Sequence, residues 1–137
     1  MEAAGLPTAK GSSEPISDAS VASDLADDIG YPVIIKAAAG GGGIGMQIVK
    51  EAKEFESALK LCQSRAKSAF GDERVFVEKY IEGAQHVEFQ VLADGKQAIH
   101  FGERFCSIQR RHQKLIEEGP WLDEAKRHEI GLSLIHI

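Results

Sequence analysis

The amino-acid sequence predicts a mixed α/β fold that divides into two parts. Up to about residue 82, short β-branched runs alternate with stretches of helical periodicity, and beyond Gly83 strand-like segments follow one another. The chain of 137 residues is 43% hydrophobic and 27% charged, which is typical of globular rather than disordered proteins. We therefore place a boundary at 81–85, between an α/β part and the start of a strand-rich part.

Two helices are predicted in the first part. The first begins at Ser17 or Asp18, either of which can cap it, and ends before Gly30. The second covers 51–70, where apolar residues recur on one face, and Gly71 follows it. Both helices thus carry a start or stop signal that matches their hydrophobic pattern.

The predicted strands consist of β-branched residues or alternate apolar with polar residues. The stretch 5–16, rich in Gly, Pro and Ser, is expected to be irregular. Asp94-Gly95 is a hairpin turn signal, and Asp123 can cap a last helix. The expected strands are 33–36, 46–49, 74–81, 86–92 and 97–101.

Charge and cysteine content narrow the class of protein. A net charge of −5, from 21 acidic and 16 basic residues, gives no electrostatic reason to expect nucleic acid as a partner. Cys62 and Cys106 lie far apart and match no metal-ligand spacing, so we interpret them as reduced thiols. The N-terminus has no signal-peptide pattern, and no apolar stretch is long enough to span a bilayer. The expected location is the cytoplasm, without contact to a membrane.

A glycine-rich tract, Gly40-Gly41-Gly42-Gly43-Ile44-Gly45, is the most informative feature of the sequence. Five glycines in six positions cost much backbone entropy on folding, unless the backbone must move or be approached closely. Two predicted strands flank the tract, and Lys36 ends the first of them. Such a loop can place backbone N–H groups around phosphates while a lysine supplies a positive charge. A flexible hairpin tip is the alternative interpretation.

The tract matches neither of two well-known phosphate loops. No Gly-Lys-Ser/Thr sequence closes it as in a Walker A loop, and its lysine precedes the glycines. A dinucleotide fingerprint requires a helix after the glycines, whereas a strand is expected here. Other parts of the sequence must therefore decide what the tract does.

Three ordered motifs supply that information. The first is Gly30-Tyr31-Pro32-Val33-Ile34-Ile35-Lys36-Ala37 with the glycine tract, the second is 78–82 with 86–95, and the third is 103–118. Together they resemble biotin carboxylases over about residues 3 to 131. The resemblance implies an incomplete ATP-grasp fold of class α/β (α+β), with a small glycine-loop lobe in 1–82 and the first strands of the large lobe in 83–131. Residues 132–137 do not continue the family pattern, and we interpret them as a non-native tail.

The resemblance also implies a role for each matching residue. Lys36 would contact the ATP phosphates, the glycine tract would close over them as a lid, and Met46 would lie against the nucleotide. The segment Glu78–Ile81 would hold adenine at the junction of the lobes, and His86 would approach the ribose. The residues implied to bind ATP are Lys36, Gly40, Gly41, Gly42, Gly43, Gly45, Met46, Glu78, Lys79, Tyr80, Ile81, His86, Gln109, His112 and Lys114.

Two of these residues, His112 and Lys114, are implied to be catalytic, with Lys114 near bicarbonate and carboxyphosphate. Ile44 stands where many family members carry a basic residue, so one phosphate contact is expected to be missing. Simpler alternatives stay open for some positions. His86 and His100 can be ordinary strand residues, and the charge run from Glu103 onward can be a solvated surface.

The implied function is that of an ATP-dependent ligase. The complete protein would use MgATP and bicarbonate to carboxylate biotin, while the metal-binding glutamates, the general base and the arginines of the family would lie beyond residue 137. No metal ligand is therefore assigned, and the 137 residues alone are expected to be inactive. Alternatives are another ATP-grasp ligase of the carbamoyl-phosphate synthetase type, or a nucleotide-binding module without catalysis.

The implied partners are ATP, bicarbonate, a biotin carrier domain and a carboxyltransferase subunit. Biotin would arrive on the separate carrier domain, and the complete protein is expected to be a homo-oligomer. Acetyl-CoA, propionyl-CoA and pyruvate carboxylases share the domain, so the acceptor that receives the carboxyl group is left open.

Overall fold

The computed structural model describes residues 7–41, 43–110 and 113–135. The chain divides into two compact units, a first unit of Ala9–Glu82 and a second unit that comprises, among the described residues, 7–8 and 83–135. Within the described residues, no helix is both long enough and apolar enough to cross a membrane.

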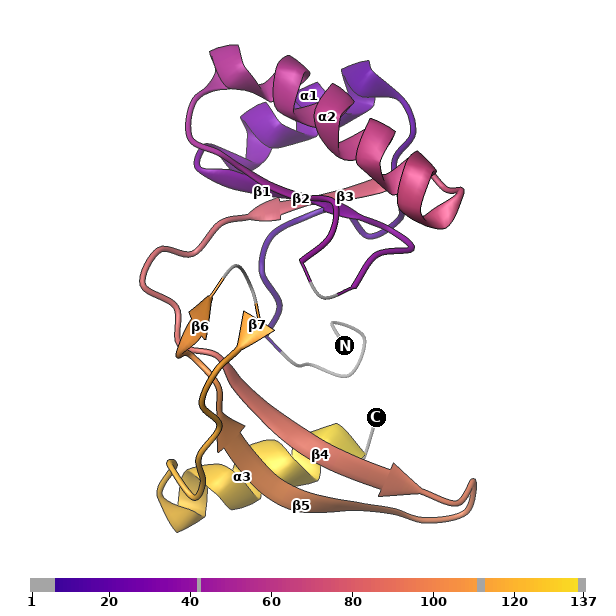
Figure 1. Cartoon of the computed structure of the whole chain (residues 1–137). Helices are drawn as coiled ribbons and strands as arrows, with labels where there is room; N and C mark the ends of the chain where they lie inside the picture. Colours follow the sequence, from indigo (N-terminus) through magenta and orange to yellow (C-terminus); the bar gives the residue numbers. More distant parts are fainter. Residues whose placement is uncertain (1–6, 42, 111–112, 136–137) are drawn as a thin grey trace. The chain divides into compact units, whose positions relative to one another are not determined.

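The first unit is a three-stranded antiparallel sheet with two helices on one face (Figure 1). The strand order is β2-β1-β3, with β1 at Val33–Ala37, β2 at Met46–Val49 and β3 at Val75–Lys79. The helices are α1 at Ala19–Ile29 and α2 at Ala52–Phe70. All five elements were predicted from the sequence, with bounds that differ by one or two residues at most of their ends.

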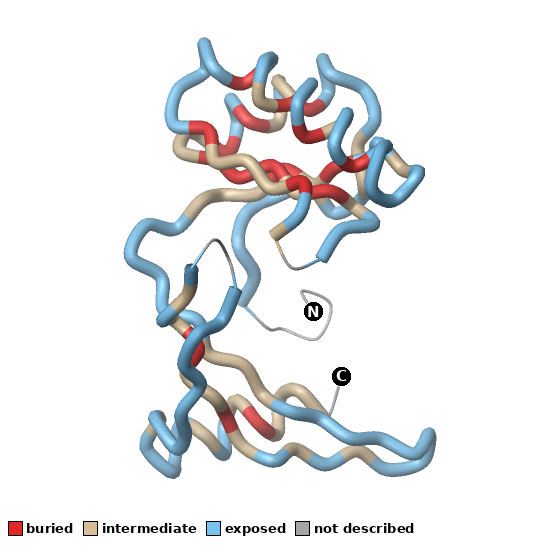
Figure 2. Tube along the Cα trace, viewed as in Figure 1, coloured by how far each residue is buried: buried red, intermediate tan, exposed pale blue. Residues whose placement is uncertain are grey.

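The core of the first unit lies between the sheet and the helices, where Figure 2 shows most of the buried residues. Alternate residues of a strand point to the same face, so every second strand residue enters this core. The helices contribute residues three or four apart, as their hydrophobic pattern requires. The side chains that fill the core include Val33, Ile35, Val49, Phe55, Leu59, Cys62, Val75 and Val77.

Both helices of the first unit begin or end at the predicted signals. The Asp18 carboxylate accepts hydrogen bonds from the backbone N–H groups of Ser20 at 2.8 Å and Val21 at 3.1 Å. Gly30 and Gly71 follow the helices with φ of 78° and 74°, values that residues with a side chain rarely adopt.

Residues 10–16 lie along the outer edge of β3, beside the three strands of the sheet. The backbone N–H of Ser12 donates to the Val77 carbonyl at 2.9 Å, and that of Ile16 donates to the Val75 carbonyl at 2.8 Å. As predicted, no helix or strand forms in this segment. The prediction was wrong in part, because the segment pairs with β3 through isolated bridges at Gly11 and Ile16. Its Gly, Pro and Ser content is unfavourable to strands, so the sequence did not indicate this pairing.

The second unit contains a long hairpin and a helix. The hairpin pairs β4, Val87–Ala93, with β5, Ala98–Phe105, and α3, Glu124–Ile135, packs against β5. Two short strands, β6 at Gln109–Arg110 and β7 at Gln113–Lys114, form a separate pair. Residues 132–135, expected to be outside the family pattern, continue α3.

Glu103 joins the helix to the hairpin. Its side chain is fully buried, and its carboxylate accepts from Nε of Arg127 at 2.6 Å. The same carboxylate accepts from the backbone N–H groups of Trp121 and Leu122, both at 2.8 Å. The Trp121 ring stacks on Phe105 with centroids 4.9 Å apart. The Arg127 guanidinium and the two N–H groups lower the pKa of Glu103 to about 2.

Part of the hairpin surface is apolar and exposed. Leu92, Ile99 and Phe101 have exposed fractions of 60%, 51% and 65%. Within the described residues this sheet has two strands, and its residues are covered less than those of the first unit, as Figure 2 shows.

Candidate functional site

A pocket of about 250 Å³ opens on the sheet of the first unit beside the glycine tract. Lys36 is paired with Met46 on β2 and with Phe76 on β3, so these residues form one row across all three strands. Because Lys36 alternates with the buried residues Ile35 and Ala37, the row lies on the face that the helices do not cover. The described lining residues are Lys36, Ala37, Ala38, Gly40, Gly41, Gly43, Ile44, Met46 and Phe76.

Backbone hydrogen bonds tie the two ends of the glycine tract together. The N–H of Ala37 donates to the Gly45 carbonyl at 2.9 Å, and the N–H of Gly40 donates to the Ala37 carbonyl at 3.1 Å. Gly45 has φ of 73°, and a Cβ added there would lie 2.8 Å from the Cβ of Ala37. A Cβ at Gly40 would lie 2.9 Å from the same atom. Glycine is therefore required at these two positions by close packing.

Cys62, on α2, forms a hydrogen bond with the end of the glycine tract. Its Sγ donates to the Gly45 carbonyl at 2.6 Å, and the side chain is almost fully buried. Burial raises the pKa of the Cys62 thiol to about 11, so the thiol keeps its proton at neutral pH. The sequence predicted Cys62 only as a reduced thiol, because nothing in its spacing points to the loop.

The predicted adenine-binding segment lies at the end of β3. The Lys79 ammonium donates to the carbonyls of Gly30 at 2.8 Å and Tyr31 at 3.1 Å, and thus fastens the end of α1 to the strand. The backbone N–H of Tyr80 donates to the Pro32 carbonyl at 3.1 Å. Ile81 is 58% exposed. Glu78 binds Lys36, with Nζ and Oε2 separated by 2.5 Å.

In the second unit, charged side chains gather around Glu88. Its carboxylate accepts from Nζ of Lys114 and from Nε of Arg104, the latter at 3.0 Å. Hydrogen bonds from these two cations, with Lys114 contributing most, lower the pKa of Glu88 to about 2. Glu117 approaches the same cations, at 3.4 Å from Nε of Arg104 and 3.7 Å from Nζ of Lys114. The predicted catalytic Lys114 is therefore held by two carboxylates.

His86 and Gln109 lie beside this cluster and contact each other. Nε2 of Gln109 is 2.7 Å from Nδ1 of His86 and donates to the Cys106 carbonyl at 2.7 Å. Because an amide nitrogen only donates, Nδ1 of His86 is the acceptor and its proton resides on Nε2. Nε2 in turn lies 3.7 Å from the Glu88 carboxylate.

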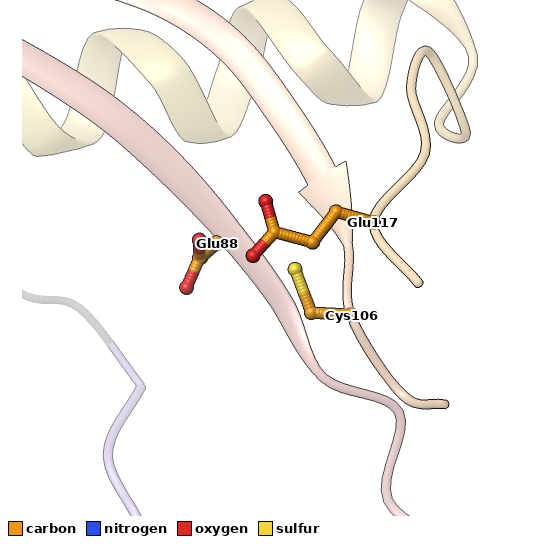
Figure 3. Close-up of side chains that lie close together, drawn as sticks. All are labelled: Glu88, Cys106 and Glu117. Atoms are coloured by element: carbon orange, nitrogen blue, oxygen red, sulfur yellow. The ribbon is translucent and has the colours of Figure 1, made fainter. Parts of the chain in front are cut away.

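Figure 3 shows the group formed by Glu88, Cys106 and Glu117, whose ligand-type atoms lie within 4.8 Å of one another. Cys106 is buried, and burial raises the pKa of its thiol, with the charge of Glu88 adding to the effect. A protonated thiol is a poor ligand for Mg²⁺, which prefers oxygen atoms. Both carboxylates also face Lys114 and Arg104. The group is therefore better explained as part of an ion-pair network.

The predicted site residues thus fall into two sets. The first unit brings together Lys36, the described glycines, Met46 and Glu78, and the second brings together His86, Gln109 and Lys114. Gly42 and His112 lie outside the described residues. Phe76 and Glu88 also belong to these sets and were not predicted from the sequence. Alternation along the strands could have found both, because Phe76 shares a strand face with Glu78, and Glu88 shares one with His86.

A family model places the chain among known proteins. The model for the ATP-binding domain of the carbamoyl-phosphate synthase L chain matches residues 1–137. The chain belongs to this family of ATP-binding domains.

Relatives of this ATP-binding domain include a pyruvate carboxylase subunit and biotin carboxylases. A pyruvate carboxylase subunit of Methanothermobacter thermautotrophicus is 56% identical over 121 residues, which are 88% of this chain and 25% of the relative. Biotin carboxylase of Pseudomonas aeruginosa is 49% identical over 134 residues, which are 95% of this chain and 30% of the relative. The chain spans about a quarter to a third of the length of such relatives.

Solved structures agree with the sequence relatives. A complex of Campylobacter jejuni biotin carboxylase with β-γ-ATP is 48% identical and has a TM-score of 0.91 over 97% of this chain and 30% of its own. The biotin carboxylase domain of Hydrogenobacter thermophilus 2-oxoglutarate carboxylase, with MgADP, ADP and bicarbonate, is 43% identical with a TM-score of 0.92 over the same shares. The predicted ATP-grasp fold and the resemblance to biotin carboxylases are confirmed.

Proposed function

We propose that this chain is the ATP-binding part of a biotin carboxylase, an enzyme that uses MgATP and bicarbonate to carboxylate biotin on a carrier domain. The observation that carries the proposal is the pocket in which Lys36 stands beside the glycine tract, between Met46 and Phe76. Relatives at about 50% identity are biotin carboxylases, and solved relatives bind β-γ-ATP, MgADP and bicarbonate.

The pocket of the first unit has the chemistry that a nucleoside triphosphate requires. The ammonium group of Lys36 offers a positive charge and three donors to phosphate oxygens. The glycines leave the backbone open to close approach, and a Cβ at Gly41 would meet no described atom within 4 Å. Met46 and Phe76 provide an apolar wall on either side of Lys36 against which the flat part of a nucleotide can pack.

The second unit is proposed to supply the groups nearest to the reacting phosphate and bicarbonate. Lys114 and Arg104 are fixed by Glu88, which reduces the rotamer entropy lost when an anion binds. His86 presents its Nε2 proton, and Gln109 fixes that tautomer. His86 would approach the ribose, and Gln109, His112 and Lys114 would face the phosphates. Lys79 would contribute through its backbone, since its ammonium already binds two carbonyls.

Magnesium needs a separate set of ligands. When bound to a triphosphate, Mg²⁺ neutralises the phosphate oxygens during phosphoryl transfer. The group of Glu88, Cys106 and Glu117 does not fit that ion, because it contains a thiol and its carboxylates already face two cations. We propose no metal ligand among the described residues and no catalytic step through the ion.

The first test is direct binding of ATP. Isothermal titration calorimetry on the 137-residue chain should show saturable binding of ATP, and Lys36→Ala should weaken it at least about tenfold, because a charge-assisted contact to phosphate contributes ~1.5–3 kcal/mol. Lys60→Ala is the matched control, since Lys60 pairs with Glu56 on the exposed surface of α2. Equal affinity of the Lys36→Ala variant and the unchanged chain for ATP would contradict the proposal that Lys36 binds its phosphates.

The second test concerns the reaction. Residues 7–135 can replace the matching segment of Pseudomonas aeruginosa biotin carboxylase, which is 49% identical over 134 residues. The chimera should release ADP in a biotin- and bicarbonate-dependent manner, whereas the 137-residue chain alone should not. A correctly folded chimera without this activity would count against the biotin carboxylase assignment.

The family model also supports a second candidate, an ATP-grasp ligase of the carbamoyl-phosphate synthetase type. The motif 103–118 and the identities of about 50% to biotin carboxylases favour the first candidate. A chimera that hydrolyses ATP with bicarbonate but does not respond to biotin would support the second.

A further inference from the structure

We propose that Glu78 is the internal counter-ion of Lys36, and that its carboxylate occupies the ammonium group until a polyphosphate displaces it. The inference rests on the proposed ATP-binding role of the pocket and adds a determinant of phosphate selectivity to it. When a polyphosphate binds, Lys36 would exchange one carboxylate for several phosphate oxygens. A nucleotide with few phosphates would displace the Glu78 carboxylate poorly and would therefore bind weakly.

The sheet register brings the two side chains together. Glu78 on β3 lies opposite Ile34 on β1, and Lys36 is two residues further along β1. Residues two apart in a strand share a face, so Lys36 and Glu78 are diagonal neighbours within reach of long side chains. Nζ of Lys36 lies 2.5 Å from Oε2 of Glu78. The contact is therefore built into the strand pairing.

A glycine on the neighbouring segment restricts where the Glu78 side chain can lie. Gly11 bridges to Glu78 at the outer edge of β3. A Cβ at Gly11 would lie 2.9 Å from Cγ of Glu78 and 2.8 Å from the Val77 carbonyl oxygen. The backbone at Gly11 thus packs directly on the stem of Glu78. This packing limits the rotamers of Glu78 and favours those that direct its carboxylate toward Lys36.

The Lys36–Glu78 pair is exposed enough for a ligand to replace the Glu78 carboxylate at Lys36. The side chains of Lys36 and Glu78 are 38% and 29% exposed, and ion pairs at this degree of exposure contribute little net stability. Lys36 also lines the pocket, where a ligand can reach it. A triphosphate carries several negative charges, so it attracts the ammonium more strongly than one carboxylate does. The carboxylate in turn repels every phosphate that approaches Lys36.

The experiment compares the binding of inorganic tripolyphosphate and ATP by calorimetry at low ionic strength. Glu78→Gln removes the competing charge and should tighten tripolyphosphate binding about five- to tenfold, the size expected for one unit charge some 4 Å away in water. The gain should shrink as salt is added. Glu56→Gln is the control, because it makes the same change in net charge and also breaks a lysine pair, on the exposed surface of α2. It should change affinity less than about twofold.

A double-mutant cycle shows whether Lys36 carries the effect. In a Lys36→Met background, Glu78→Gln should give a clearly smaller gain in tripolyphosphate affinity, because the direct repulsion of phosphate by Glu78 remains but the ammonium that Glu78 binds is gone. A full gain in that background would overturn the proposal. If Glu78→Gln does not fold, Glu78→Asp replaces it. The shorter side chain keeps the charge but reaches Lys36 less well, so it should give a smaller gain of the same sign.

The outcomes separate this inference from the proposed function. If the unchanged chain binds neither ATP nor tripolyphosphate, the nucleotide site itself is wrong and the counter-ion role falls with it. If the unchanged chain binds both and Glu78→Gln does not tighten tripolyphosphate, only the counter-ion role is overturned. Weaker binding of ATP with unchanged binding of tripolyphosphate would also overturn it, because Glu78 would then act on the base.

Discussion

Replacing Glu103 by glutamine tests how the second unit holds its helix. In the native chain one buried carboxylate binds Arg127 and the backbone N–H groups of Trp121 and Leu122. Glutamine has nearly the same shape and keeps one acceptor oxygen, but it loses the charge and places two N–H donors where acceptors are needed. The substitution therefore leaves Arg127 without its carboxylate and disturbs the start of α3.

The size of the effect follows from burial. Breaking a buried ion pair by removing one partner costs about 3–5 kcal/mol. The Arg127 side chain is 27% exposed and can recover some hydration, and glutamine keeps part of the hydrogen bonding. We therefore expect a loss of ~2–3 kcal/mol in the free energy of unfolding of the second unit. For a domain of this size, that corresponds to a fall in melting temperature of roughly 10–20 °C.

The assay uses the single tryptophan of the chain. Trp121 stacks on Phe105 and donates its backbone N–H to Glu103, so its fluorescence reports on this junction. Urea and thermal unfolding should be followed by Trp121 emission and by circular dichroism. The control is Glu129→Gln, which removes an exposed pair with Lys126 and should cost less than about 0.5 kcal/mol. Equal stability of the two variants would refute the role assigned to Glu103.

Two further predictions concern the loop and the effect of pH. Gly45→Ala should weaken ATP binding at least about tenfold in the same titration, because its φ of 73° and its contact with Ala37 leave no room for a Cβ, and unchanged affinity would contradict this explanation. Glu88 and Glu103 both have a pKa lowered to about 2 from 4.5, so their stabilisation is present above pH 4.5 and is lost as the pH falls toward 2. Urea unfolding between pH 6 and 2 should show this loss, and a flat profile would contradict the two ion-pair networks.

The sequence predicted the regular elements of the first unit because local signals and hydrophobic pattern agree there. Asp18 caps α1, Gly30 and Gly71 end the two helices, and β-branched residues form β1. Pairing of 10–16 with β3 escaped prediction, because Gly11 packs closely on Glu78 and has no strand propensity of its own.

The site was predicted less completely than the fold. Motif resemblance indicated Lys36, Glu78 and Lys114, but it did not reveal which charged side chains these residues contact. The Lys36–Glu78 pair depends on strand register, and the Lys114–Glu88 pair brings together residues 26 positions apart. Cys62 reaches the Gly45 carbonyl from another element. Such contacts arise from tertiary packing, which single-sequence patterns do not encode.

The hairpin of β4 and β5 affects how the isolated chain will behave in solution. Within the described residues its sheet has two strands and therefore two edges, with an isolated bridge from Phe105 to Glu118, and Leu92, Ile99 and Phe101 add apolar surface. Surfaces of this kind promote intermolecular strand pairing and precipitation as concentration rises. Titrations of the chain are therefore best performed at micromolar concentration, with light scattering recorded in parallel. Replacing Phe101 by lysine would make the protein easier to handle without touching the nucleotide pocket.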